Sequence, residues 1–233
     1  MRVTGENWMG RLARLIACAS LMLLPVMVQA GEDDPWEGVN RKIFRFNDTI
    51  DTYALKPLAQ GYQAVTPQFL EDGVHNIFGN IGDVGNLAND LLQGKFHDAG
   101  VDTSRLLFNT TFGLLGFFDV ARHMGLRKND EDFGQTLGAW GLQSGPFVVL
   151  PLLGPSTVRD TVGLLPDSQL APYPYIDHVP TRNLTRAVDV VDTRASLLSA
   201  EKLISGDKYL FIRNAYLQNR EFKVQDGQVE DDF

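Results

Sequence analysis

Apolar residues repeat with a helical period along most of this chain. Between residues 36 and 54 they fall at Val39, Ile43, Phe46, Ile50 and Tyr53, alternately four and three positions apart. Such spacings place them on one face of a helix. Similar spacings recur toward the C-terminus, whereas the alternation typical of half-buried strands is scarce. The pattern therefore predicts an all-α fold with many short helices and few long ones.

Glycine, proline and other helix-terminating residues divide this helical pattern into segments. We expect helices over residues 36–54, 67–78, 83–94, 98–110, 133–140, 156–165, 181–198 and 208–223, a short helix opened by Pro57 and one turn at 119–124. Gly79, Gly82 and Gly85 predict a break between the second and third of these helices. Pro166 predicts a helix end and an extended connector to residue 180. The last two helices, joined by a turn at 205–207, are expected to form an αα-hairpin.

The segment GQTLGAWGLQSGPFVVLPLLGPS, residues 134–156, departs from the helical pattern. Five glycines and three prolines interrupt it, which rules out a long helix. Its remaining residues are mostly apolar, although loops are normally exposed and polar. The segment must therefore have an apolar environment despite its irregular backbone.

Two further apolar stretches are rich in glycine, at residues 76–94 and 109–118. Each glycine inside a helix costs roughly 0.5–1 kcal/mol relative to alanine. One explanation is a compact core in which tight helix crossings need small residues. The other is a set of short amphipathic helices that lie in a bilayer interface, for which about three turns is a suitable length.

Residues 1–30 are typical of an export signal peptide. Basic residues precede an apolar run at 15–28 that is too short to span a bilayer as a helix. Val28-Gln29-Ala30 resembles a cleavage site, and a retained membrane anchor is the alternative. Cys18, the only cysteine, is a candidate lipidation site, although most of the apolar run follows it.

Composition and charge narrow the possible functions. The formal net charge of −8 and pI of about 4.9 argue against nucleic acid as a partner and against broad electrostatic binding to anionic lipid headgroups. Residues 31–224 are predicted to form a single helical domain. Residues 225–233 are acidic and are predicted to form a disordered tail.

Motifs for catalysis, metals or cofactors are lacking in the sequence. The four histidines form no metal-ligand spacing, and no phosphate-cradling GxxxxGK[ST] is present. A nucleophile elbow needs glycine two residues before its serine, but Gly141 stands three residues before Ser144. The sequence predicts a protein that is not an enzyme and needs no cofactor.

Six segments spread along the chain carry a family resemblance. They are DPWEGVNRKIFRFN (34–47), LLQGK (91–95), RLLFNTTFGLLGFFDVA (105–121), EDFGQTLGAWG (131–141), GPFVVLPLLGPSTVRD (145–160) and YLQNR (216–220). In this order they resemble the MlaA/VacJ family of outer-membrane proteins and cover nearly all of the chain after residue 30.

The resemblance implies a role in phospholipid transport. It implies a ring of helices in the inner leaflet of the outer membrane, on its periplasmic side, around a central amphipathic pore and beside a trimeric porin. Phospholipid mislocalised in the outer leaflet would pass to the periplasmic carrier MlaC, maintaining membrane asymmetry. Family members typically carry a lipidated cysteine at the mature N-terminus. This chain departs from that pattern, because GED precedes Asp34.

The resemblance also suggests site residues. The pore hairpin would comprise Gly138, Trp140, Gly141, Gly145, Pro146, Phe147, Val149, Leu150, Gly154 and Pro155. It would act as a gate hinged at glycines or as a static plug. Membrane-interface positions would be Ile77, Phe78, Val84, Leu87, Leu91 and Leu92. Polar pore lining would come from Asn80, Asn86, Asn89, Asn109 and Thr110, for which helix caps and turns are the alternative.

Without the family resemblance, the sequence is also compatible with two other functions. A porin-associated structural protein would bind porin without passing lipid. A phospholipid hydrolase would need a nucleophile and base, or a metal, which the motifs do not supply. The sequence leaves open the direction of transport, the headgroup preference, the porin and the oligomeric state.

Overall fold

A computed structural model describes residues 34–171 and 173–227. The predicted export signal, with Cys18 and the cleavage site after Ala30, lies outside the described residues, as do residues 228–233 of the predicted tail. The described residues form one compact unit. Within the described ranges, no helix combines the length and apolar character needed to cross a bilayer.

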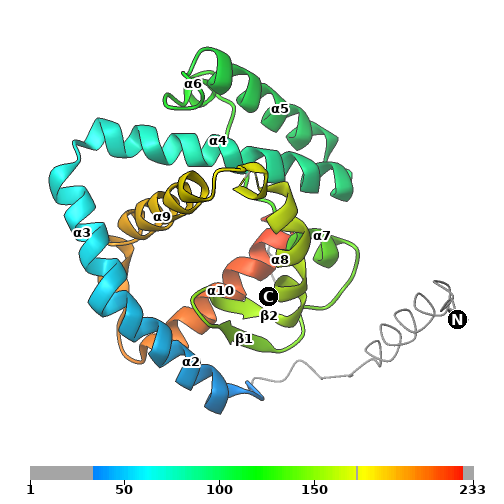
Figure 1. Cartoon of the computed structure of the whole chain (residues 1–233). Coiled ribbons are helices and arrows are strands. Elements are labelled where there is room, and N and C mark those ends of the chain that lie inside the picture. The colour runs from blue at the N-terminus through cyan, green and yellow to red at the C-terminus, as the bar shows by residue number, and fades with distance from the viewer. Residues whose placement is uncertain (1–33, 172, 228–233) are drawn as a thin grey trace, which may run out of the picture. The chain divides into compact units, whose positions relative to one another are not determined.

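The described chain is largely helical, with one small antiparallel sheet (Figure 1). Its elements, in order, are α2 (Glu37–Ile50), the π-helical turn η1 (Asp51–Leu55), α3 (Lys56–Val65), α4 (Gln68–Gln93), α5 (Phe96–Thr111), α6 (Val120–His123), α7 (Phe133–Ala139), β1 (Phe147–Leu150), β2 (Gly154–Thr157), α8 (Val158–Leu170), the 3-10 turn η2 (Tyr173–Tyr175), α9 (Val179–Ser196), the 3-10 turn η3 (Ala200–Leu203) and α10 (Lys208–Val224).

Helix α4 runs unbroken through the glycines that were expected to interrupt it, so the predicted break is wrong. Its inward stripe contains five buried polar residues, Asn80, Asp83, Asn86, Asn89 and Asp90. Hydrogen bonds from this stripe to other elements hold the helix, and they outweigh the low helix propensity of glycine. Gly94 ends the helix with φ +77°, as the sequence predicts.

Helix α8 also continues past its expected end. Pro166 lies inside the helix, so the helix end predicted at this proline is wrong. Proline removes one helical hydrogen bond, but the turn that follows has another anchor. The Asp167 carboxylate accepts from the backbone N–H of Phe133 at 3.0 and 3.1 Å and from Asn89 Nδ2 at 3.3 Å. These contacts fix the last turn of α8 against α7 and α4.

The all-α prediction is wrong at the β1–β2 hairpin. The two strands pair antiparallel, with Phe147 opposite Thr157 and Leu150 opposite Gly154. The connecting turn has Leu152 at φ +64° and Gly154 at φ +89°. The apolar residues FVVL have strong strand propensity, but a run of four is too short to be distinguished from a helical segment by period.

Helices α9 and α10 have the expected extents but separate partners, so the predicted αα-hairpin is wrong. Helix α9 packs mainly against α3 and α4, whereas α10 packs against α7 and β2. In Figure 1, α9 lies on the inner side of α3 and α4, and α10 lies next to the hairpin. Asp207 caps α10 by accepting from the N–H groups of Tyr209 and Leu210.

The usual distribution of polar and apolar residues is inverted. The buried apolar residues are few, and the main cluster consists of Phe147, Val149 and Tyr209, with partly buried neighbours from α2 and α10. Buried polar and charged residues outnumber them. Large apolar side chains are exposed on nearly every helix, for example Tyr53, Phe96 and Leu107. Folding therefore places the polar stripes of several helices inside.

The glycines serve two different purposes. A Cβ on Gly163 of α8 would lie 2.6 Å from the backbone nitrogen of Gly134 in α7, so these helices cross at a contact that only glycine allows. Gly82 and Gly85 of α4 face open space, because a Cβ there would meet nothing within 4 Å. Tight packing thus explains the α7–α8 glycines but leaves those two positions of α4 without a packing reason.

Candidate functional site

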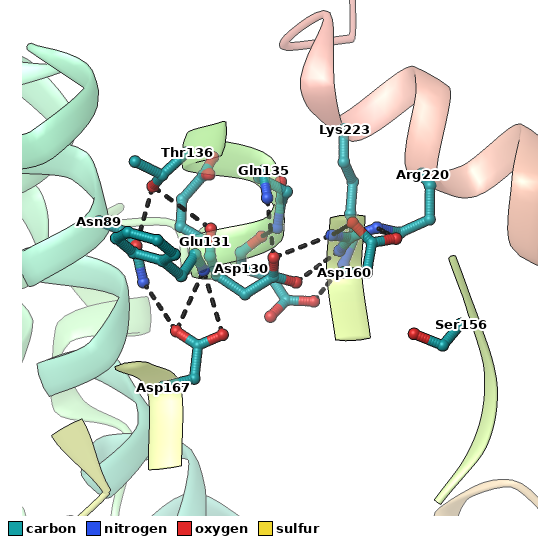
Figure 2. A network of polar contacts seen from close by, with 12 residues as sticks. Asn89, Asp130, Glu131, Gln135, Thr136, Ser156, Asp160, Asp167, Arg220 and Lys223 are labelled. Atoms are coloured by element: carbon teal, nitrogen blue, oxygen red, sulfur yellow. Dashed lines mark hydrogen bonds and ion pairs between the residues drawn. The ribbon is translucent and has the colours of Figure 1, made fainter. Parts of the chain in front are cut away.

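The base of the hairpin is fixed by a buried ion network around Arg220 of α10 (Figure 2). The Arg220 guanidinium donates to both oxygens of Asp160 at 2.8 and 3.0 Å. It also donates to both oxygens of Asp132, with the Nη2–Oδ1 distance at 2.9 Å. Because Asp132 caps α7 and Asp160 lies in the first turn of α8, one side chain joins both ends of the segment containing the hairpin.

The electrostatics of this network favour the charged carboxylates. Burial by itself raises the pKa of Asp160, but hydrogen bonds from Arg220 and Tyr216 outweigh burial and hold that pKa below its usual value. The pKa of Asp132 is lowered in the same way, mainly by Arg220 against the effect of burial. Tyr216 and Arg220 belong to the segment YLQNR, so this family motif has a structural role.

A second polar cluster joins α4 to α7 and α8. Thr136 donates to Asn89 Oδ1 at 2.8 Å, and Asn89 Nδ2 donates to Asp167 at 3.3 Å. Asn86 Oδ1 accepts from the N–H of Glu131 at 3.1 Å. Figure 2 shows Asn89 and Asp167 pointing toward each other from different elements.

A third cluster joins α4, α5 and α6 around Arg105, which is 3% exposed. Arg105 donates to Asp83 at 3.2 Å, to Asp119 at 3.1 Å and to the carbonyl of Leu126 at 2.7 Å. Asn109 donates to Asp119 at 3.0 Å and accepts from the N–H of Ala121 at 2.9 Å. Side-chain bonds thus hold the short helix α6 in place.

Asp102 of α5 is fully buried, and among the described residues neither of its carboxylate oxygens has a hydrogen-bond partner. Burial, followed by the nearby carboxylates of Asp83 and Asp90, raises the pKa of Asp102 to about 7. The structure thus keeps this group neutral through mildly acidic pH.

Two asparagines of α2 hold the outer edge of strand β1. Asn40 donates to the carbonyl of Phe147 at 3.0 Å and accepts from the N–H of Val149 at 2.9 Å. Asn47 donates to the carbonyl of Leu150 and accepts from the N–H of Leu152, each at 2.8 Å. The two amides satisfy backbone groups that an edge strand otherwise leaves unpaired.

Neither asparagine was among the site residues predicted from the sequence. The available signal was their separation by two helical turns, on a stripe of α2 that lies about 100° around the helix from Val39 and Phe46, which are 58% and 51% exposed. Periodicity identifies the two faces of such a helix, but it does not indicate that the polar face is the buried one.

The predicted hairpin residues lie together but in different surroundings. Phe147 and Val149 are buried, whereas Trp140 is exposed and donates from Nε1 to the carbonyl of Leu92 at 3.1 Å. The expected hinge glycines, Gly141, Gly145 and Gly154, all have positive φ, which permits sharp bends that other residues resist. Leu152 and Leu153 at the tip are 70% and 71% exposed.

The remaining predicted site residues fall into two groups. Of the membrane-interface positions, Val84, Leu91 and Leu92 are exposed, whereas Ile77, Phe78 and Leu87 are partly buried. Of the polar positions, Asn80, Asn86, Asn89 and Asn109 are buried, and Thr110 is exposed. The bonds of these asparagines join different elements, so they are more than local helix caps. Their role as pore lining stays a prediction.

Comparisons with known proteins give consistent matches over most of the chain. The family model "MlaA lipoprotein" matches residues 32–223. A Shigella flexneri protein, "Intermembrane phospholipid transport system lipoprotein MlaA", is 34% identical over 93% of this chain and 86% of its own. A Haemophilus influenzae protein of the same name is 35% identical over 84% of this chain and 81% of its own.

A solved structure is also similar. It is described as "Structural basis for maintenance of bacterial outer membrane lipid asymmetry" and matches with a TM-score of 0.73 at 31% identity. The match covers 83% of this chain and 100% of the other. The likeness therefore extends over most of the fold and is not limited to one motif.

We expect Arg220→Met to destabilise the fold by about 3 kcal/mol, because it removes the cation that the buried Asp160 and the partly exposed Asp132 share, and leaves Asp160 with Arg159 alone. Lys223→Met removes the same charge from the same helix, but its partner Asp130 is 75% exposed. That control should cost no more than about 1 kcal/mol. Denaturant unfolding of the purified variants in detergent measures both. Equal effects would contradict a special role for Arg220.

Asp102→Asn should change the pH dependence of stability. Because the folded pKa of about 7 exceeds the ordinary value of 3.8, the neutral carboxyl contributes stability that is fully present below about pH 4. This contribution is lost as the pH rises through about 7, by at most about 1.4 kcal/mol per pH unit. Asparagine stays neutral, so the variant should gain most over wild type at pH 8 and less at pH 5.

Unfolding free energies at pH 5, 6, 7 and 8 test this expectation. Asp98→Asn, a half-exposed position of the same helix, is the control substitution. A difference between Asp102→Asn and wild type that does not vary with pH would show that Asp102 titrates alike in the folded and unfolded states.

Proposed function

This chain belongs to the MlaA lipoprotein family, and from this we propose that it is the outer-membrane component of a phospholipid transport system. It removes phospholipid mislocalised in the outer leaflet and so maintains the lipid asymmetry of the membrane. The transfer makes and breaks no covalent bond, and the protein acts as a passage and not as an enzyme.

The inverted burial of polar and apolar residues is the observation that carries this proposal. Large apolar side chains cover the outside of the described helices, and charged side chains are paired inside. In water, such exposed apolar area would favour aggregation. In a bilayer, apolar side chains face acyl chains at no cost, whereas unpaired polar groups are expensive.

We further propose that the helices lie in the inner leaflet, on the periplasmic side, as a ring around a central amphipathic pore. The exposed residues Val84, Leu91 and Leu92 of α4 support this placement, because they form an apolar stripe opposite its buried polar stripe. A pore of mixed character suits a phospholipid, since its headgroup needs polar contacts while its tails avoid water. A soluble carrier, MlaC, receives the lipid, and a trimeric porin lies beside the ring.

The hairpin is the proposed gate of this pore. Its base is clamped by Arg220 and by the buried Asn40, whereas its tip is held by the Asn47 amide at an exposed end. The tip can therefore separate from α2 by breaking two hydrogen bonds while the base stays in place. Gly154, with φ +89°, lies at the point where such a movement bends the chain.

Deletion of the gene should raise outer-leaflet phospholipid in intact cells, and the wild-type gene should restore the normal level. The measurement is chemical or enzymatic labelling of surface-exposed phospholipid. Unchanged surface phospholipid together with altered porin assembly would favour the porin-associated structural protein. Production of lysophospholipid by the purified protein would favour a hydrolase.

A disulfide between the hairpin tip and α2 should abolish lipid removal. Asn47 Oδ1 accepts from the backbone N–H of Leu152 at 2.8 Å, so residues 47 and 152 are neighbours, and Asn47→Cys with Leu152→Cys is the pair to oxidise to a disulfide. We expect the oxidised variant to leave surface phospholipid as high as in the deletion, and reduction to restore removal. Each single cysteine variant is a control, and full activity with the disulfide formed would contradict gating.

A further inference from the structure

A basic pocket lies between α4, α5 and α6, away from the hairpin and its ion network. Its volume is about 310 Å³, and the segment after α6 completes its wall. The charged lining residues are Arg105, Arg122, Arg127, Lys128 and one carboxylate, Asp119, with His75 at its edge. Such a concentration of cations is unusual in a chain with a formal net charge of −8.

Two of these cations are occupied by the protein itself. Arg105 is bonded to Asp83 and Asp119, as described for the third polar cluster. Lys128 lies 3.3 Å from Asp83 and donates to the carbonyl of Gly79 at 2.9 Å. The carboxylates at and behind the pocket wall are therefore already matched by these two side chains.

Arg122 and Arg127 are not occupied in this way. Both are exposed at the pocket, and within residues 34–171 and 173–227 neither forms an ion pair or a side-chain hydrogen bond. Two guanidinium groups without a protein partner leave the pocket with an excess of positive charge. An arginine guanidinium can donate two hydrogen bonds at once to the oxygens of a planar carboxylate or a tetrahedral phosphate group.

Asn80 provides an independent sign of a missing ligand. It lines the pocket, is 7% exposed and donates to Thr110 Oγ1 at 3.1 Å, but in the described part of the chain its Oδ1 has no partner. A buried amide normally has its polar atoms satisfied. Reversal of the amide keeps the bond to Thr110, whose hydroxyl also donates, and then leaves an N–H unpaired. Either orientation leaves one polar atom of Asn80 unsatisfied at the pocket wall.

The turn between α5 and α6 touches the wall of this pocket and carries exposed apolar residues. Leu114 and Leu115 are 67% and 70% exposed, and both have positive φ, at 52° and 60°. Non-glycine residues resist that conformation, but Asn76 holds the turn by donating to the carbonyl of Phe117 at 3.2 Å. A Cβ on Gly116 would lie 2.6 Å from Cβ of Asn80, so the turn touches the pocket wall.

We propose that the basic pocket binds the phosphate of a phospholipid headgroup through Arg122 and Arg127, with Leu114 and Leu115 against the acyl chains. The proposal takes its substrate class from the proposed function. Apolar side chains beside basic ones are the arrangement by which proteins bind at the depth of lipid phosphates. The pocket is then a docking position for lipid, separate from the gate.

The test is a lipid titration of the purified full-length protein in detergent, with bound ligand counted by native mass spectrometry. The probes are phosphatidylglycerol and diacylglycerol with the same acyl chains, which lacks the phosphate. We expect Arg122→Gln with Arg127→Gln to weaken phosphatidylglycerol binding by at least about tenfold, because charge-assisted hydrogen bonds are lost. Diacylglycerol binding should not change.

The matched control is Arg45→Gln with Arg182→Gln, which removes the same charge outside the pocket. Phosphatidylglycerol binding that is unchanged in the pocket variant, or equally weakened in the control, would overturn the proposal. Titration with sn-glycerol 3-phosphate and with inorganic phosphate distinguishes the source of the phosphate. Binding of either at the affinity of the lipid, and with the same arginine dependence, would assign the pocket to a soluble phosphate.

The binding result and the proposed function can fail separately. Normal surface phospholipid after gene deletion, together with arginine-dependent phosphatidylglycerol binding, would overturn the transport function and leave the pocket assignment intact. Raised surface phospholipid after deletion, together with arginine-independent binding, would overturn the pocket assignment and leave the function intact.

Discussion

The buried ion pairs of Arg220 determine how the rest of the structure is held. Arg220 binds Asp132 before the hairpin and Asp160 after it, so it closes the chain between α7 and α8 at one point. The contact between Gly134 and Gly163 lies beside these pairs, since a Cβ on Gly134 would touch both Asp160 and Arg220. Because separating largely buried charges is costly, we expect this junction to resist movement, so the proposed gating would involve segments farther along the hairpin.

The polar interior sets this fold apart from that of a typical water-soluble helical protein. Buried apolar residues are too few to drive folding by the hydrophobic effect alone, and the largest fully buried side chains are polar, including Gln135 and Asn89. In a bilayer, contacts between helices depend instead on hydrogen bonds, ion pairs and close packing. Such bonds are directional and specify which elements meet, as Asn89 shows by joining α4 to α7 and α8.

Helical period located most helices from the sequence, and its failures share one cause. The break expected in α4 is absent because Asn80, Asp83 and Asn86 face inward, where tertiary contacts override glycine propensity. The hairpin was missed as strands because its β1 edge is completed by Asn40 and Asn47, about a hundred residues earlier. The family resemblance predicted the hairpin as a site, but these long-range bonds leave no local pattern. The local sequence pattern distinguishes the two faces of a helix or strand, but it does not indicate which other elements those faces contact.

The two ends of β1 differ in a way that suits a gate without an energy source. Asn40 binds the buried start of the strand, whereas Asn47 binds its end beside the exposed Leu152. Two hydrogen bonds to an exposed turn contribute about 0.5–1.5 kcal/mol each, so an open tip lies a few kcal/mol above the closed one. States at that energy are populated at about 0.1–10%. For the proposed gate, opening in contact with acyl chains would add little further cost because Leu152 and Leu153 are already exposed, and lipid that binds the open tip would shift the population.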